Sequence, residues 1–404
     1  MRETRVFTVE PHPDVELGCV RKPIDVHLIM PEKGINEDTG VILVLGDFDQ
    51  YADSKELKEE FCPYLADKLN CISIGVNYFG IYRNKSIEIK ESFLHNFNRI
   101  YNGAELCFDE FKKMRTQDEI FRLMAERVIS RGITSLDIRC QPTMVTSRGE
   151  YQSWGFLPAI DCLQALGQTL REYEINQRRI MVYGRGYGAY IALLLGKYAP
   201  HTFSVIIDRE GYAKAELRHI VSGELMTVDY EYAFNIRHSD LKFTISAGSN
   251  NPWTIDDELS GAYFSDSHRK IRSMIVEKHR IASETRYYIL HTEDNYASSI
   301  KDKDACVFHL SKCNPVYYNR IPCLHSAEES LLGEKRLPNE SLDMLHDQDI
   351  INWVAEIDQE DLSKETPSTD YNLNSTHVFD CGEREYRFQF RDDYSLQVVI
   401  GNKP

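Results

Sequence analysis

The stretch Gly184–Gly188, with the sequence GRGYG, comes nearest to a catalytic motif in residue type and spacing. It follows an apolar segment over 179–183 and precedes another over 189–195. In a nucleophile elbow, G-x-S-x-G, the flanking glycines let a strand and a helix approach closely while the central hydroxyl projects from a strained turn. Both flanking glycines are present here, but Gly186 stands at the nucleophile position. Acyl transfer through a serine would therefore lack its nucleophile.

A glycine-rich turn of a nucleotide-binding fold is the alternative interpretation of this stretch. The dinucleotide motif has the spacing G-x-G-x-x-G and belongs to the first strand–helix turn of its fold. Here the glycines alternate as G-x-G-x-G, and several strand-like segments precede the turn. The pattern therefore favours an elbow whose nucleophile is missing.

A catalytic acid and a histidine should follow such an elbow in that order. A strand is predicted over 286–290, and Asp294 lies a few residues past its end, where a triad acid would project from the sheet edge. Glu293 and Asp208 are competing candidates for the acid. His346 comes just before a predicted helix. A lone histidine is more often structural, but order and position make Asp294 and His346 the expected acid and base.

Two backbone N–H donors are needed to form an oxyanion hole. The loop Gly46-Asp47-Phe48, after an early strand, is in the right place to supply the first. The amide of Tyr187, which follows the nucleophile position, would supply the second and needs no serine. Because a helix N-terminus favours negative charge, this site is expected to accept a carboxylate or phosphate.

Short apolar segments that alternate with amphipathic ones predict the scaffold for this turn. Uninterrupted apolar runs such as 41–45 and 71–78 are typical of strands buried on both faces of a parallel sheet. Apolar spacing predicts a helix over 155–172, and another is expected to begin near Ser54 and to kink at Pro63. The alternation predicts an α/β fold with a doubly wound, mostly parallel sheet of α/β-hydrolase type. The strands expected are 5–9, 24–29, 41–45, 71–78, 179–183, 204–207 and 286–290.

Two excursions interrupt this alternation. Residues 81 to about 150 include a long polar helix candidate over 104–129 and are interpreted as a helical insertion. A second insertion is expected over about 215–283, where it could cap the sheet. We therefore expect one α/β-hydrolase-like domain over 1–360 that carries both insertions.

The C-terminal tail, residues 366–404, has a different character. It begins as a polar, loop-like stretch and ends in two strand-like segments, 386–390 and 395–400, with Arg-Asp-Asp between them. This pattern predicts a C-terminal β-hairpin extension.

The amino-acid composition limits the kinds of partner and cellular location that we expect. The net charge of -16, with no basic stripe, argues against nucleic-acid binding because phosphate contacts need a dense basic surface. The chain has no run of about 18 apolar residues that would span a membrane, and its first residues lack a secretory signal. Its ten cysteines are scattered without zinc-binding spacing, which favours a reducing, cytoplasmic location and predicts neither metal nor cofactor.

The chain also resembles a bacterial family, domain of unknown function 2920, over most of residues 5–360. The family implies an α/β-hydrolase fold, and Asp294 and His346 match its expected acid and base. Its elbow usually has serine, histidine and glycine where this chain has Gly186, Tyr187 and Gly188. Its members lie near genes for flagellar and surface-glycan modification, which implies a glycan-like ligand. The matching residues are Gly188-Ala189-Tyr190, Ala199-Pro200, Phe203, Ile207-Asp208, Tyr212-Ala213-Lys214, Trp253-Thr254, Tyr263-Phe264-Ser265, Ile271-Arg272 and His279.

Three functions are consistent with these features. The favoured one is a degenerate hydrolase that binds a small-molecule or glycan-like ligand, or a partner, in the former active-site cleft. The alternative is an active esterase or acyl-transfer hydrolase that uses a non-serine nucleophile, such as Tyr187, or water activated by His346. The third is an assembly protein, for instance a homo-oligomer, whose hairpin edge pairs with another chain.

Overall fold

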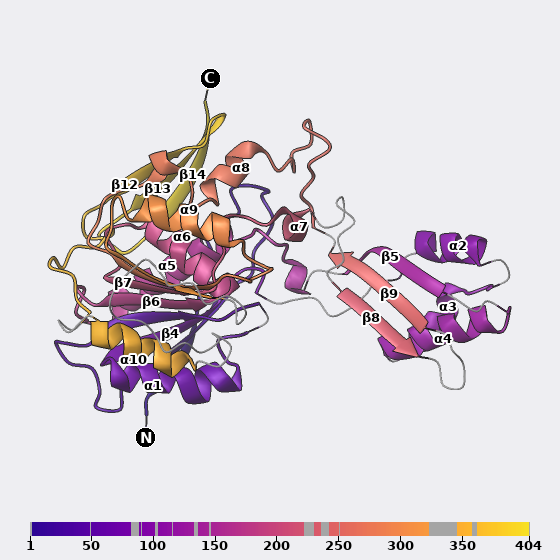
Figure 1. The fold of residues 1–404 in the computed structure, drawn as a ribbon, viewed down its shortest axis with the longest axis horizontal. Coiled ribbons are helices and arrows are strands. Elements are labelled where there is room, and N and C mark those ends of the chain that lie inside the picture. Colours follow the sequence, from indigo (N-terminus) through magenta and orange to yellow (C-terminus); the bar gives the residue numbers. More distant parts are fainter. Residues whose placement is uncertain are drawn as a thin grey trace. The chain divides into compact units, whose positions relative to one another are not determined.

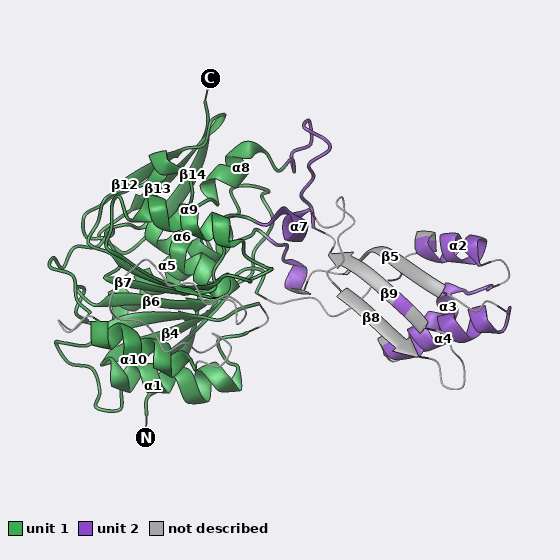
Figure 2. Ribbon diagram, in the orientation of Figure 1, with its two compact units in different colours: residues 1–82, 153–215, 264–404 green, residues 83–152, 216–263 purple. Residues whose placement is uncertain are grey.

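The computed structural model divides the chain into two compact units. Unit 1 comprises residues 1–82, 153–215 and 264–404, and unit 2 comprises residues 83–152 and 216–263 (Figure 2). No helix in the described part of the chain is both long and apolar enough to cross a membrane. The residues described are 2–48, 50–81, 89, 91–101, 104–114, 116–132, 136–144, 147–221, 230–235, 242–249, 251–322, 346–357 and 362–403.

Unit 1 is built on an eight-stranded sheet with the order β1-β2-β4-β3-β6-β7-β10-β11. The strand β2 pairs antiparallel with both of its neighbours, and every pair from β4 to β11 is parallel. A mostly parallel sheet with this order and one reversed strand near its edge is the α/β-hydrolase sheet, so the predicted fold class is confirmed. The strands are β1 (Thr4–Val9), β2 (Ile24–Ile29), β3 (Gly40–Leu45), β4 (Cys71–Asn77), β6 (Ile180–Arg185), β7 (Val205–Arg209), β10 (Arg286–Thr292) and β11 (Val316–Ile321).

Helices cover both faces of this sheet (Figure 1). On one face, η1 (Glu56–Phe61), α1 (Cys62–Lys68) and α10 (Asp347–Ile357) bury apolar side chains against the strands, Leu65 and Ile350 among them. On the other face lie α5 (Phe156–Glu172), α6 (Tyr187–Tyr198) and α9 (Ile300–Leu310). The central strands β3 and β4 are buried throughout, as their apolar runs predict.

The predicted irregularity near Pro63 has a defined form. The helix begins with the π-type turn η1 and changes to the α-helix α1 at Cys62. Pro63 lies directly after this junction, where the change of hydrogen-bond register accommodates a residue that has no N–H to donate.

The C-terminal residues form a three-stranded antiparallel sheet in the order β12-β13-β14. The strands are β12 (Thr376–Asp380), β13 (Arg384–Phe390) and β14 (Leu396–Asn402), so the predicted hairpin is confirmed and gains a third strand. This sheet packs on the α5 and α6 side of unit 1. Phe388 stacks on Tyr198 with ring centroids 4.4 Å apart, and Phe156 meets the rings of Tyr386 and Phe388 edge-on.

The segment of unit 1 that precedes β10 contains two short helices, α8 (Asp266–Ile271) and η3 (Glu277–His279). Each carries a buried histidine, His268 and His279. Burial and the nearby Arg272 and Arg384 lower the pKa of His268 to about 2. Burial and Lys197 lower the pKa of His279 to about 3. Both rings are therefore neutral in the folded protein.

Acid should destabilise unit 1 through these two rings. The unfolded chain protonates both histidines below about pH 6.5, whereas the folded chain does not, so stability is lost as the pH falls from 6.5 towards 3. Each ring should contribute up to about 1.4 kcal/mol per pH unit in that window. Urea unfolding at a series of pH values measures this slope. His268→Gln should reduce it, and an unchanged slope in that variant would exclude His268 as a source.

Unit 2 has its own core and its own sheet. Helices pack through a cluster that includes Phe97, Phe121 and Met124. The predicted long helix over 104–129 is interrupted, because Thr116 caps the N-terminus of α4 in a capping box with Glu119. The sheet has the order β5-β9-β8, and its strands were not expected. The elements are α2 (Glu91–Ile100), α3 (Phe108–Phe111), α4 (Gln117–Ile129), β5 (Leu136–Met144), η2 (Ser147–Gly149), α7 (Leu217–Ile220), β8 (Tyr230–Asn235) and β9 (Lys242–Ser249).

Candidate functional site at the β6–α6 elbow

The glycine-rich stretch forms a sharp turn between β6 and α6. Gly186 is the N-cap of α6 and has φ 53° and ψ -119°, a conformation that L side chains rarely adopt. A Cβ on Gly184 would lie 2.5 Å from the carbonyl oxygen of Gly188. A Cβ on Gly188 would lie 2.2 Å from the carbonyl oxygen of Leu45. Both flanking glycines are thus required by close backbone approach, which is the mechanical role they have in an elbow.

The carboxylate of Asp47 fills the space beside Gly186. A Cβ on Gly186 would lie 2.3 Å from Cγ of Asp47. The backbone amide of Tyr187 donates a hydrogen bond of 2.8 Å to Oδ1 of Asp47, and the amide of Phe48 donates another of 2.8 Å to the same oxygen. The expected oxyanion donor at Tyr187 is therefore already bonded to an anion that the chain supplies. This contact also places a negative charge at the N-terminus of α6, where the helix dipole favours it.

The four residues expected to form the oxyanion site lie together. Gly46 lies against Gly188, because a Cβ on Gly188 would be only 2.4 Å from the carbonyl oxygen of Gly46. The ring of Phe48 stacks on Tyr187 with centroids 4.2 Å apart and an interplanar angle of 10°. Trp154 packs against both rings, at 5.4 Å and 5.0 Å. The loop after β3 is thus fastened to the elbow by its backbone, by the Asp47 carboxylate and by an aromatic cluster.

Tyr187 has no accessible hydroxyl to serve as a nucleophile. Its side chain is buried, and its hydroxyl oxygen accepts a hydrogen bond of 2.7 Å from the amide of Gly155. Burial raises the pKa of Tyr187 well above its ordinary value, so the phenolate is disfavoured. The Tyr187 side chain therefore packs in the interior, and its backbone amide serves as a hydrogen-bond donor.

A charged cluster lies at the carboxyl ends of β6 and β7, beside the elbow. Asp347, which is nearly buried, accepts hydrogen bonds from the hydroxyl of Tyr183 and from the guanidinium groups of Arg209 and Arg185, the last at 3.1 Å. Arg185 also binds Glu56 at 2.9 Å. Burial, with the Asp347 carboxylate beside it, raises the pKa of Tyr183 well above its usual range. Two arginines and two carboxylates therefore neutralise one another next to Gly186.

Sequence reasoning missed this cluster, although two signals were present. Arg185 lies inside the elbow motif itself, and Asp347 directly follows His346. Gln50 joins the two parts of the site, because its Oε1 accepts hydrogen bonds from the Arg185 guanidinium at 2.8 Å and from the Asp47 amide at 3.2 Å. The loop after β3 and the end of β6 are thus held in one network.

His346 and Asp294 both lie on the exposed surface of unit 1. His346 immediately precedes α10, and its backbone N–H donates to Asp349 at 3.1 Å. Its neighbour Asp347 places it near the ends of β6 and β7. Asp294 follows the end of β10. The His346 imidazole has no hydrogen bond to a described residue, so the structure does not join the expected acid and base into a pair.

The two alternative candidates for the catalytic acid, Asp208 and Glu293, form ion pairs with other residues. Asp208 is buried and forms an ion pair of 2.6 Å with Lys303. Glu293 pairs with Arg320 at 2.6 Å. Each has a cationic partner that stabilises the ionised carboxylate, and neither contacts a histidine through these bonds.

A different acid and histidine meet where β7 and β10 end. Oε2 of Glu210 lies 3.2 Å from Nδ1 of His291, whose Nε2 donates to the carbonyl oxygen of Ser298 at 3.0 Å. Burial lowers the pKa of His291 to about 3 and raises that of Glu210. The ring is therefore neutral, and its Nδ1, although close to the Glu210 carboxylate, has no hydrogen bond of good geometry to a described residue. Glu210 has φ 62°, a strained backbone for a residue with a side chain, and its hydrogen bonds to Thr292 and Asn295 hold it there.

Comparisons with known proteins were made for the whole chain. A family model described as "Protein of unknown function (DUF2920)" matches residues 5–314. No match was found among curated proteins. Two solved structures of similar fold are the uncomplexed acylaminoacyl peptidase of Pyrococcus horikoshii (14% identity, TM-score 0.46, covering 91% of this chain and 43% of the peptidase) and a putative dipeptidyl aminopeptidase IV from Bacteroides ovatus (11% identity, TM-score 0.44, covering 80% and 32%). The chain thus spans less than half the length of these structures.

Proposed function

The chain belongs to the family of proteins of unknown function DUF2920, and we propose that in this member the elbow binds an anionic group of a ligand without attacking it covalently. Gly186 has no hydroxyl, so no acyl-enzyme can form at the nucleophile position. The histidine and the acid have no nucleophile to activate there. The elbow retains the backbone N–H donor of Tyr187 at the N-terminus of α6.

The observation that carries this proposal is the bond between the Tyr187 amide and the Asp47 carboxylate. At 2.8 Å it is a charge-assisted hydrogen bond at a helix N-terminus. The elbow amide thus donates to a carboxylate oxygen in the folded chain, which supports the proposal. Asp47 is exposed, so it can leave this position when a ligand carboxylate or phosphate takes its place.

The ligand class follows from this donor set together with the family resemblance. An amide at a helix N-terminus recognises carboxylate and phosphate oxygens alike. The family's association with surface-glycan and flagellin modification points to a sugar as the rest of the ligand. A carboxylated or phosphorylated sugar, or an acylated glycan with such a group, combines both requirements.

Asp47→Ala tests this proposal because it removes the internal anion and leaves the amide free. We expect inorganic phosphate or glucuronate to raise the melting temperature of Asp47→Ala more than that of the wild-type chain. Saturation at about 100 times the dissociation constant would add about 2.7 kcal/mol. Asp392→Ala, which removes an exposed carboxylate from the C-terminal sheet, is the matched control and should behave as wild type. Equal responses from all three proteins would refute binding at the elbow.

A second candidate function rests on the same carboxylate. Because Asp47 lies where the nucleophile side chain would be, its carboxylate could attack an electrophilic carbon, as the aspartate nucleophiles of other enzymes do. Oδ would form an ester with the substrate and release the leaving group. Water, deprotonated by His346, would then attack Cγ and regenerate the acid.

This route has an isotopic signature. A single turnover in H₂¹⁸O would leave ¹⁸O in the Asp47 carboxylate, detectable by the mass of its peptide. Alcohol formation from a reactive alkyl halide, whose saturated carbon the carboxylate attacks, with label in Asp47 would support this second function and exclude the binding-only proposal. Labelled product with unlabelled Asp47 would instead indicate direct attack by water.

A further inference from the structure

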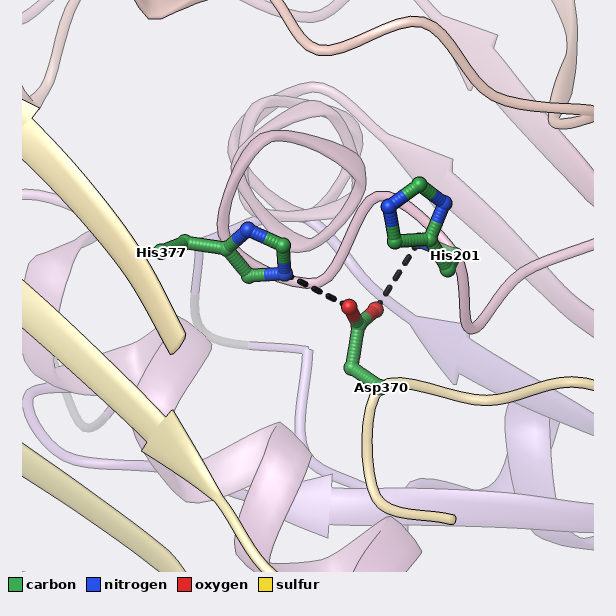
Figure 3. A group of neighbouring side chains, drawn as sticks. All are labelled: His201, Asp370 and His377. Carbon is green, nitrogen blue, oxygen red and sulfur yellow. Dashed lines mark hydrogen bonds and ion pairs between the residues drawn. The ribbon is translucent and has the colours of Figure 1, made fainter. Parts of the chain in front are cut away.

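His201, Asp370 and His377 converge in unit 1 from three separate segments (Figure 3). His201 lies in the loop between α6 and β7, Asp370 lies ahead of β12, and His377 is on β12 itself. Since α6 begins at the elbow and His201 follows its end, the group lies at the amino edge of the parallel strands. It is therefore separate from the elbow site.

Hydrogen bonds from neighbouring groups fix the orientation of the Asp370 carboxylate. Its Oδ2 accepts a hydrogen bond of 2.9 Å from the backbone amide of His201 and another of 2.9 Å from the hydroxyl of Thr202. Its Oδ1 faces Nε2 of His377 at 2.6 Å. One oxygen is thus fixed by neutral donors, and the other is directed at an imidazole nitrogen. Ligating carboxylates in metal sites are fixed in the same manner by hydrogen bonds from outside the metal shell.

The two imidazole rings complete a set of three ligands. Their centroids are 5.8 Å apart, and one ligand atom from each of the three residues lies within 4.8 Å of the others. Ligands of a tetrahedral zinc ion, with bonds of about 2.0–2.2 Å, lie roughly 3.4 Å apart. To bind the ion, the His201 ring would therefore move towards the other two residues, while Oδ1 of Asp370 and Nε2 of His377, 2.6 Å apart, would separate slightly. The His201 ring has no hydrogen bond to a described residue, which leaves its nitrogens available.

The ammonium group of Lys364, which binds the same loop as His201, does not compete for Oδ1. Lys364 directs its protons to backbone carbonyl oxygens, those of His201 at 2.6 Å, Thr202 at 3.0 Å and Ser368. These bonds tie the segment before β12 to the same loop that carries His201. A cation between the three side chains would therefore add to an existing junction without displacing the lysine.

We propose that His201, Asp370 and His377 bind a zinc ion with water in the fourth position, and that this ion fastens the C-terminal sheet to the α6–β7 loop. Two imidazoles and one carboxylate are a ligand set that zinc takes in proteins. His201 is half-buried, which leaves room for a water ligand on its side. The group lies at the amino edge of the parallel strands, so the ion would act on the junction between the C-terminal sheet and the α6–β7 loop and not on the elbow.

Zinc content and melting temperature of the full chain test this proposal. After chelator treatment and dialysis, the wild-type chain should take up about one zinc ion per chain from an equimolar zinc chloride solution and melt at a higher temperature. His201→Ala should fold in the absence of metal, because its ring makes no hydrogen bond to a described residue, and should lose about 100-fold or more in zinc affinity. His95→Ala, which removes an exposed histidine of α2, should bind zinc as wild type does.

His377→Ala and Asp370→Asn are less suited to stand alone, since Asp370 also caps the His201 loop. If these variants lower the melting temperature equally with and without zinc, the group is a hydrogen-bonded junction and the proposal is wrong. Failure of the wild-type chain to retain zinc, or retention of zinc by His201→Ala, would overturn it as well.

Discussion

Replacing Asp347 with alanine should lower the free energy of unfolding by about 3–5 kcal/mol, because it removes the carboxylate that compensates a largely buried arginine. The Asp347 side chain is only 8% exposed and that of Arg209 14% exposed. Removal of the carboxylate leaves the Arg209 guanidinium and the Tyr183 hydroxyl without their shared acceptor. Urea unfolding monitored by tryptophan fluorescence measures the loss.

Asp349→Ala is the matched control for this change. It removes a carboxylate two residues away that contacts the His346 backbone amide at the start of the same helix. Loss of such a cap costs about 1 kcal/mol. If Asp347→Ala were no more destabilising than Asp349→Ala, the cluster at the ends of β6 and β7 would not have the importance that its burial implies.

Restoring the missing nucleophile with Gly186→Ser should fail when it is the only change. The serine Cβ would lie 2.3 Å from Cγ of Asp47 and 2.5 Å from its Oδ1, so the loop after β3 would have to move. Overpacking of this kind costs about 1–3 kcal/mol, and a non-glycine residue at φ 53° adds about 1–3 kcal/mol of backbone strain. We therefore expect Gly186→Ser to be destabilised by about 2–6 kcal/mol and to hydrolyse no activated ester.

The double variant Gly186→Ser/Asp47→Ala separates the two causes. Removing the carboxylate should recover the overpacking part, about 1–3 kcal/mol, while the backbone strain remains. It also frees the Tyr187 amide for an oxyanion. A double variant as unstable as the sum of the two single variants would show that Asp47 does not occupy the nucleophile's space.

The fold was largely predictable because the central strands are uninterrupted apolar runs. Segments such as Val41–Leu45 are buried on both faces, and a short uninterrupted apolar run is typical of such a strand. The edge strand β11, Val316–Ile321, escaped prediction because most of its residues are only partly buried and its sequence is mixed. The hairpin was visible from its turn, whereas β12, with the sequence THVFD, carries little strand signal of its own.

The candidate site was predictable only in its backbone. The flanking glycines and the amide of Tyr187 follow from the local motif. The partners of the charged groups do not, because they come from distant parts of the chain: Arg209 and Asp347 are 138 residues apart, and Tyr187 and Asp47 are 140 apart. Local spacing also cannot reveal that Asp47 would occupy the place of the missing side chain. The expected pairing of Asp294 with His346 stays a prediction.

We propose that the elbow is complete in its backbone and lacks a nucleophile. The most direct test is an active-site titration of the wild-type chain with an activated ester, followed by measurement of the intact mass of the protein. We expect no burst of product and no acyl adduct. A burst of about one equivalent per chain, with an adduct that disappears in His346→Ala, would contradict the claim.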